Sequence, residues 1–231
     1  MSTDQRIAPF PPHSGVANAT LGVFALASIT NLAFLLAPVL GVRLGFTTSF
    51  VSEFGARGEP GASFYHRADN LNGLLLLIGI ALIWRVVPAN VLTRIALICL
   101  VFTGIFTITD GFSPLDCTPT ADAMCRLEEA RREVSFSHQV HNFTGIGEAA
   151  TIGFALVFLG FGLWRDAMWG RWARWFMGLG IFFSLANIMI IAQYIYGVPW
   201  LGVTQRSGIA TFALFLLIIG IAGYDAWQRH D

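Results

Sequence analysis

The stretch LTRIALICLVFTGIFTITDGF, residues 92–112, decides the fold of this chain. It carries no charged side chain between Arg94 and Asp110. A helix needs about 20 predominantly apolar residues to cross the hydrocarbon core of a membrane, and similar apolar stretches occur before and after this one. The sequence therefore predicts an all-α fold, a polytopic membrane helix bundle with six transmembrane helices. The predicted helices cover residues 16–40, 68–87, 92–112, 138–164, 174–196 and 205–227.

Composition supports a membrane protein and excludes other classes. The 231 residues are 55% hydrophobic and 12% charged, and the mean hydropathy is +0.64, whereas soluble domains carry roughly a quarter charged residues. The formal net charge is zero, so no extended basic surface exists for nucleic acid. Every basic residue is arginine, which excludes Schiff-base chemistry on a lysine.

We expect a single domain with both termini in the cytoplasm. The two tight connections, 85–94 and 164–174, hold arginines close to helix ends, and positively charged loops stay preferentially on the cytoplasmic side. The N-terminal region lacks the compact basic segment of a signal peptide, so we expect the first helix to be retained. The expected organisation is a cytoplasmic tail at 1–15, a transmembrane domain at 16–228 with outer loops at 41–67 and 111–137, and a cytoplasmic tail at 229–231.

The cysteines support the same orientation. Cys117 and Cys125 lie in the segment SPLDCTPTADAMCRLEE of the expected outer loop, where an oxidising compartment allows a disulfide to persist. Their spacing is not that of a zinc ribbon, which uses short C-x2-C pairs. We therefore expect a Cys117–Cys125 disulfide, and we expect Cys99 to be a small buried hydrophobe.

Ionisable residues gather at the helix ends on the expected outer side, which is costly unless they are paired, hydrated or functional. The segment SHQVHNFTGIGEAATIGF, residues 137–154, places His141 and Glu148 on one helical stripe. Arg206 is the expected counter-ion for a carboxylate. Two residues have a simpler alternative, because Asp69 can be a helix N-cap and Asp110 a turn residue. The expected ligand-binding residues are Asp69, Asp110, Glu148, Gln205 and Arg206.

Three histidines fall at expected outer helix ends, two of them in an H-x-x-H pair. Three histidines with one open position form a catalytic zinc site, in which bound water becomes a nucleophile near neutral pH. His66, His138 and His141 are the candidate metal ligands, zinc is the candidate cofactor, and Asp110 or Glu148 is the candidate catalytic base. The alternative is that these histidines only bond to headgroups and water.

Four motifs follow one another along the chain: SEFGARGEPGASF after the first helix, FSPLDC after the third, a histidine that opens the fourth, and GVTQR at the sixth. In this order the sequence resembles a bacterial six-helix membrane protein family known as domain of unknown function 998. The resemblance covers nearly the whole chain and implies a six-helix integral membrane protein with an outward polar cluster and no assigned activity. It also implies a multi-pass protein of the plasma membrane, the bacterial inner membrane. The residues that match the pattern are Ser52, Gly55, Pro60, Asp116, His138, Gln205 and Arg206.

Three functions agree with these features. The first is an outward-facing polar pocket that binds a lipid headgroup or a small amphipathic ligand. The second is an intramembrane zinc hydrolase that acts on a lipid, and the third is a structural or accessory subunit of a membrane complex. Membrane lipid is the expected partner in the first two, and nucleic acid is not a partner in any.

Overall fold

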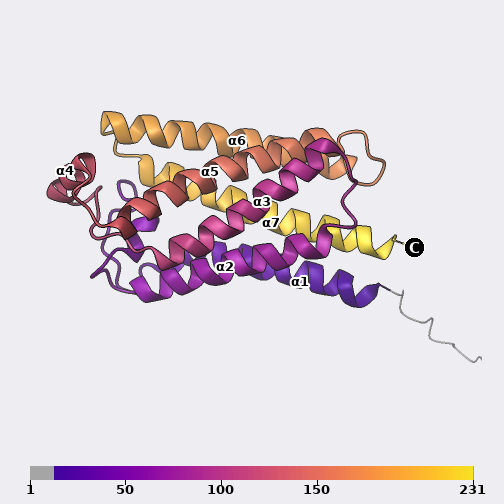
Figure 1. The fold of residues 1–231 in the computed structure, drawn as a ribbon, viewed down its shortest axis with the longest axis horizontal. Coiled ribbons are helices and arrows are strands. Elements are labelled where there is room, and N and C mark those ends of the chain that lie inside the picture. Colours follow the sequence, from indigo (N-terminus) through magenta and orange to yellow (C-terminus); the bar gives the residue numbers. More distant parts are fainter. Residues whose placement is uncertain (1–12, 231) are drawn as a thin grey trace, which may run out of the picture.

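The computed structural model describes residues 13–230. Over this range the chain is all-α and contains no strand. Long helices lie side by side along the length of the molecule, and one short helix sits at the end of the bundle opposite the C-terminus (Figure 1). The α-helices are α1 (Ser14–Asn31), α2 (Ala62–Ile83), α3 (Val91–Phe112), α4 (Ala123–Arg131), α5 (Phe136–Leu163), α6 (Gly170–Tyr196) and α7 (Leu201–Gln228), and the short 3-10 helices are η1 (Ala33–Leu36) and η2 (Ser52–Gly55).

The six long helices close into a ring. Each packs against its neighbours in the chain, and α1 packs extensively against α7. The order around the ring is therefore α1, α2, α3, α5, α6, α7. The short connections between α2 and α3, α5 and α6, and α6 and α7 favour an antiparallel arrangement of these neighbours. The start of α1 and the end of α7 lie at one end of the bundle, and α4 lies at the other, which we call the α4 end (Figure 1).

The chain is a multi-pass membrane protein. Four helices are long and apolar enough to cross a bilayer, namely α3, α5, α6 and α7. The more polar α1 and α2 are not among these four. The predicted all-α membrane class is thus confirmed, while the count of six spans stays a prediction.

The first helix is shorter than predicted. It ends at Asn31 instead of residue 40, and η1 follows it. The Asn31 amide donates a 2.9 Å hydrogen bond to the Ile209 carbonyl oxygen of α7, and Asn72 donates to Thr30 Oγ1 at 3.0 Å. These polar contacts hold the chain at the point where the apolar pattern alone would continue the helix.

The second helix begins earlier than predicted, at Ala62. Gly61 precedes it with a left-handed φ of 79°, which glycine adopts without the penalty of a Cβ. Asp69 therefore lies inside α2, and the N-cap alternative for Asp69 is wrong. Asp110 lies inside α3, whose last residue is Phe112.

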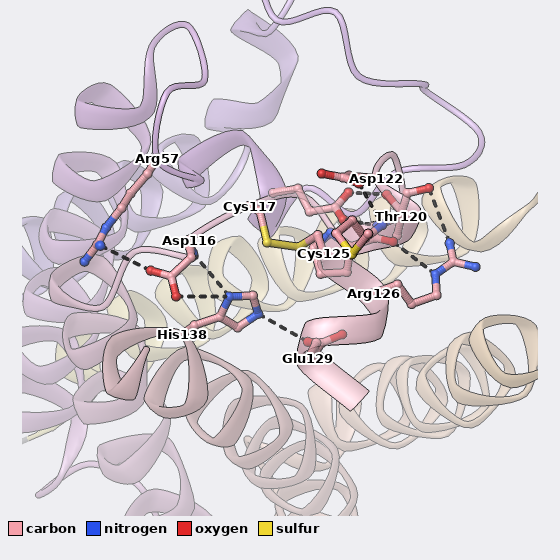
Figure 2. The surroundings of a disulfide bond; sticks show 12 residues. Arg57, Asp116, Cys117, Thr120, Asp122, Cys125, Arg126, Glu129 and His138 are labelled. Atoms are coloured by element: carbon pink, nitrogen blue, oxygen red, sulfur yellow. Dashed lines mark hydrogen bonds and ion pairs between the residues drawn. A yellow bond between two sulfur atoms is a disulfide. The ribbon is translucent and has the colours of Figure 1, made fainter. Parts of the chain in front are cut away.

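The loop at 111–137 contains a helix that was not predicted, α4. Asp122 caps its first turn by accepting a 2.8 Å hydrogen bond from the Met124 N–H, and Arg132 ends it with a left-handed φ of 59°. The predicted Cys117–Cys125 disulfide is present and joins this helix to the segment before it (Figure 2).

The apolar core lies mainly in the half of the bundle away from α4. Small residues let α5 and α6 approach closely there: a Cβ on Gly160 would lie 2.6 Å from Met177 Cβ, and a Cβ on Gly180 would lie 2.8 Å from Leu156 Cβ. Nearer the α4 end, nothing lies within 4 Å of the position of a Cβ on Gly145. The two helices diverge toward α4 in Figure 1, so the bundle is tightly packed at one end and open at the other.

Candidate ligand-binding cavity

A cavity of about 1070 Å³ occupies the half of the bundle nearer α4. All six long helices contribute to its lining, together with η2 and α4. It has the size expected of a site for a small molecule, since ligand pockets measure roughly 300–1,000 Å³. The chain has a formal net charge of zero, but opposite walls of this cavity differ strongly in polarity.

One wall is apolar and reaches the outer surface of the bundle. Ile146 and Phe154 of α5 line the cavity and are 72% and 55% exposed. Ile188, Ile191 and Ile195 of α6 also line it and are exposed. Residues that face both the cavity and the outside define a side opening between α5 and α6, which we call the α5–α6 opening.

The wall formed by α2, α3 and α5 carries carboxylates. Glu148 Oε1 accepts a 3.0 Å hydrogen bond from the Thr107 hydroxyl. Asp110 accepts a hydrogen bond from the Thr144 hydroxyl, and its Oδ1 lies 3.3 Å from Nδ1 of His141. Asp69, Asp110 and Glu148 all line the cavity. The structure therefore brings together three of the predicted ligand-binding residues.

Arg206 is not the counter-ion of these carboxylates, which corrects the prediction. Its side chain is buried, and Nη1 donates to the carbonyl oxygens of Phe46 at 2.7 Å, Ser49 at 3.1 Å and Gly202 at 2.9 Å. The guanidinium also stacks 4.6 Å above the Phe46 ring. No ion pair joins Arg206 to a carboxylate within residues 13–230.

Gln205 has a similar structural role. Its Oε1 accepts a 2.5 Å hydrogen bond from the Val51 N–H, and the residue also lines the cavity. Gln205 and Arg206 therefore fasten the 41–67 loop to the start of α7. Their main role is to hold this loop over the α4 end of the bundle, rather than to bind a ligand.

The three histidines do not converge. Across the described part of the chain, no group of three or more His, Cys, Asp or Glu side chains is arranged to hold a metal. The His138 ring is fully buried, its Nδ1 accepts a 3.2 Å hydrogen bond from the Asp116 N–H, and its Nε2 lies 3.3 Å from Glu129 Oε1. Both ring nitrogens of His138 are thus already bonded, which leaves no lone pair for zinc.

The other two histidines face different partners. His141 Nδ1 lies 3.0 Å from the Ser113 carbonyl oxygen, and the His66 ring packs against Gly55, where a Cβ would lie 3.0 Å from His66 Cε1. The predicted three-histidine zinc site is therefore not supported by the geometry, and with it the hydrolase alternative loses the group that would activate water.

Glu129 of α4, which was not among the predicted site residues, joins three helices at the mouth of the cavity. Its Oε1 accepts a 2.6 Å hydrogen bond from Asn142 Nδ2 of α5, and its Oε2 accepts a 2.8 Å hydrogen bond from the Tyr194 hydroxyl of α6. His138 Nε2 completes the set. This bridge, which we call the Glu129 bridge, connects α5 and α6 through α4 at the end where the two helices diverge.

Asp116 holds the start of α5 in place. It accepts hydrogen bonds from the Ser135 N–H at 2.6 Å and the Ser135 hydroxyl at 2.8 Å, and it pairs with Arg57 at 3.2 Å. Figure 2 shows Asp116 between Arg57 and His138. Burial disfavours the charged form, but the bonds from Ser135 and the Arg57 charge outweigh it, so the pKa of Asp116 lies below its usual value.

Glu53 of η2 is a second carboxylate that was not predicted as a site residue. It is fully buried and accepts hydrogen bonds from the Phe50 N–H at 3.1 Å, the Thr120 N–H at 2.6 Å and the Thr120 hydroxyl. It therefore ties the 41–67 loop to the disulfide-bonded loop. Burial raises the pKa of Glu53 above its ordinary value of 4.5, although these hydrogen bonds favour the charged form and oppose the shift.

The raised pKa of Glu53 predicts a pH effect on the outer loops. A carboxyl whose pKa is higher in the folded state stabilises the fold below its unfolded pKa and loses that contribution as pH rises through the folded pKa. We expect Glu53→Gln to remove this part of the pH dependence, which lies above the ordinary carboxyl pKa of 4.5. Unfolding temperatures of both proteins across this range test it. A difference between them that does not change with pH would contradict the expectation.

A family described as "Protein of unknown function (DUF998)" matches residues 13–222 of the chain. The chain belongs to this family. The match extends from the start of α1 into α7, so the cavity, the disulfide and the Glu129 bridge all lie within the DUF998 region. The search of curated proteins found no match, and neither did the search of solved structures.

The sequence of this DUF998 chain contains signals for some of the site residues that were not predicted. Glu53 lies within SEFGARGEPGASF, one of the motifs that carry the resemblance, and Asp116 lies within FSPLDC. Glu129 follows Cys125 by one helical turn, so a helix in the disulfide loop would have placed it toward the bundle. Tyr194 gave no signal, because one tyrosine near the end of an apolar helix is typical of a membrane interface.

Proposed function

We propose that this protein binds a small amphipathic molecule or the headgroup of a membrane lipid in the cavity. The observation that supports this proposal is that one wall of the cavity carries carboxylates and the other wall is apolar. Carboxylates of α2, α3 and α5 form one side, and the exposed apolar residues of α5 and α6 form the other. A molecule with a polar end and a hydrocarbon tail can contact the carboxylates with its polar end and the apolar residues with its tail. A purely polar or purely apolar molecule is complementary to only one wall.

In this proposal the ligand enters sideways through the α5–α6 opening. Both helices are apolar enough to span a membrane, so the opening faces lipid tails. A lipid can then place its tail against Ile146 and Ile191 while its head reaches Glu148. The Glu129 bridge lies at the α4 end of the opening and limits how far α5 and α6 separate.

The binding proposal is tested by filling the cavity. Ala149 lines the cavity, and Ile181 is an exposed residue of α6 outside it. We expect Ala149→Trp to remove most of the amphiphile that purifies with the protein, and Ile181→Trp to retain it, as measured by native mass spectrometry. Equal retention by the wild type and both variants would argue against a ligand in the cavity.

We also propose six spans, with both termini in the cytoplasm and α4 outside, in the plasma membrane of a bacterium. Support comes from the arginines of the tight connections at 85–94 and 164–174 and from the disulfide at the α4 end, because disulfides persist outside the reducing cytosol.

This orientation predicts the labelling pattern of the cysteines. In intact cells, a membrane-impermeant maleimide should label Cys117 and Cys125 only after mild reduction, and it should leave Cys99 of α3 unlabelled. Double replacement of Cys117 and Cys125 by serine is the control that removes the signal. Labelling that appears only after the membrane is permeabilised would reverse the orientation.

A further inference from the structure

The cavity collects acidic side chains, and the basic side chains of its described lining are two histidines, His66 and His141. Among the described residues, its lining includes no arginine, and the chain has no lysine. Arg206 of α7 is not in the lining, and it donates to three carbonyl oxygens. Carboxylates within the membrane-spanning part of a protein are costly unless a partner compensates them. The acidic residues of the lining are Glu53, Asp69, Asp110, Glu129 and Glu148.

These carboxylates differ in the number of hydrogen-bond donors and cations that contact them. Glu53 and Glu129 accept several hydrogen bonds each, and Asp110 has Thr144 and His141. Within the described part of the chain, Glu148 has one hydroxyl donor, Thr107, and makes no ion pair. Asp69 makes no side-chain hydrogen bond or ion pair with any residue between 13 and 230.

Tyr65 supplies an independent observation. It lies one turn before Asp69 on α2, lines the cavity and is only 6% exposed. Its hydroxyl is buried and has no hydrogen-bond partner among residues 13–230, although buried tyrosine hydroxyls usually find one. An unpartnered hydroxyl and an unpartnered carboxylate that lie one helical turn apart on α2, both in the lining, indicate that this wall binds the polar end of a ligand.

We propose that the ligand of the cavity is a cationic amphiphile, a molecule with a protonated amine or quaternary ammonium at one end and a hydrocarbon chain at the other. This inference rests on the proposed function and adds the charge of the ligand. The cation lies against Asp69 and Glu148, with the Tyr65 hydroxyl and ring beside it. Oxygen acceptors and aromatic rings both attract an ammonium group.

The charge can be tested with two ligands of the same shape. Dodecanoylcholine carries a quaternary nitrogen, and 3,3-dimethylbutyl dodecanoate carries a carbon atom in its place. Each competes, in lipid nanodiscs, with an uncharged dodecyl probe that bears a photoreactive diazirine on its chain. Concentrations are compared within the membrane, so that partitioning does not decide the result.

We expect dodecanoylcholine to displace the probe at a concentration about tenfold lower than the neutral ester, a difference of about 1.4 kcal/mol. Asp69→Asn and Glu148→Gln should each remove most of this preference. Glu133→Gln makes the same chemical change at an exposed residue of the loop after α4 and should leave the preference intact. Tyr65→Phe, which removes only the unpartnered hydroxyl, should weaken the binding of the cation more than that of the ester.

The outcomes separate this inference from the proposed function. Equal displacement by the two esters, unchanged in Asp69→Asn, would overturn the cationic ligand and leave a cavity that binds neutral amphiphiles. Failure of the probe to label the cavity at all would overturn the proposed function. Native mass spectrometry distinguishes the source: an amine-headed lipid that purifies with the wild type and is lost in Asp69→Asn indicates a membrane lipid, and its absence beside tight binding of dodecanoylcholine indicates a free amphiphile.

Discussion

Replacing Arg206 by methionine should lower the free energy of unfolding by about 3 kcal/mol. Methionine retains much of the apolar volume but removes the donor to the Phe46 and Ser49 carbonyl oxygens. Hydrogen bonds from a charged donor contribute about 1.5–3 kcal/mol each, and a buried acceptor left without a donor costs about 1–3 kcal/mol. Denaturant unfolding in mild detergent, followed by circular dichroism, measures the change.

Arg43→Met is the matched control for this prediction. Arg43 lies in the same loop and is exposed, so its replacement should change stability by no more than about 0.5 kcal/mol. The 41–67 loop should also exchange its amide hydrogens faster in Arg206→Met and not in Arg43→Met. Equal stability of the two variants would mean that Arg206 does not fasten the loop.

Replacing Glu129 by alanine should have the second-largest effect, a loss of about 2 kcal/mol or more. The change leaves the Asn142 amide, the Tyr194 hydroxyl and His138 Nε2 without their shared acceptor, and hydrogen bonds to a charged group are worth about 1.5–3 kcal/mol each. Because Glu129 is partly exposed, water compensates some of the loss. Denaturant unfolding measures the stability.

The same variant should change the local dynamics of the opening. Loss of the Glu129 bridge should increase hydrogen exchange in α4 and in the last turns of α6, because both depend on it. Glu128→Ala, a change on the neighbouring residue of α4, is the control and should have little effect. Faster exchange spread evenly over the whole bundle would show general destabilisation and contradict a local role.

The apolar pattern predicted the helices of the bundle well where packing agrees with it. Residues 92–112 were predicted as a helix, and α3 covers Val91–Phe112. The pattern failed at residues 16–40, where the Asn31 amide is bonded to α7 and the helix stops. It also missed α4, because this helix is short and polar and is held by the Cys117–Cys125 disulfide and the Asp122 cap. Such contacts depend on distant or non-periodic residues.

Part of the candidate site was predictable from carboxylates that interrupt apolar segments. Asp69, Asp110 and Glu148 were selected because carboxylates near a membrane need a partner, and the structure places all three around one cavity. The partner assigned to them, Arg206, was wrong because its acceptors are backbone carbonyls of a loop, which no side-chain pattern reveals. Glu129 was missed because its role depends on the position of α4.

The central claim, that an amphipathic molecule enters between α5 and α6 and occupies the cavity, is tested most directly by mapping where a photoreactive dodecyl probe attaches. In nanodiscs we expect label at the cavity-lining residues between 146 and 154 of α5 and between 188 and 195 of α6, and we expect Ala149→Trp to abolish it while Ile181→Trp preserves it. Label spread evenly over the lipid-facing surfaces of α3, α5 and α6, unchanged in Ala149→Trp, would contradict the account.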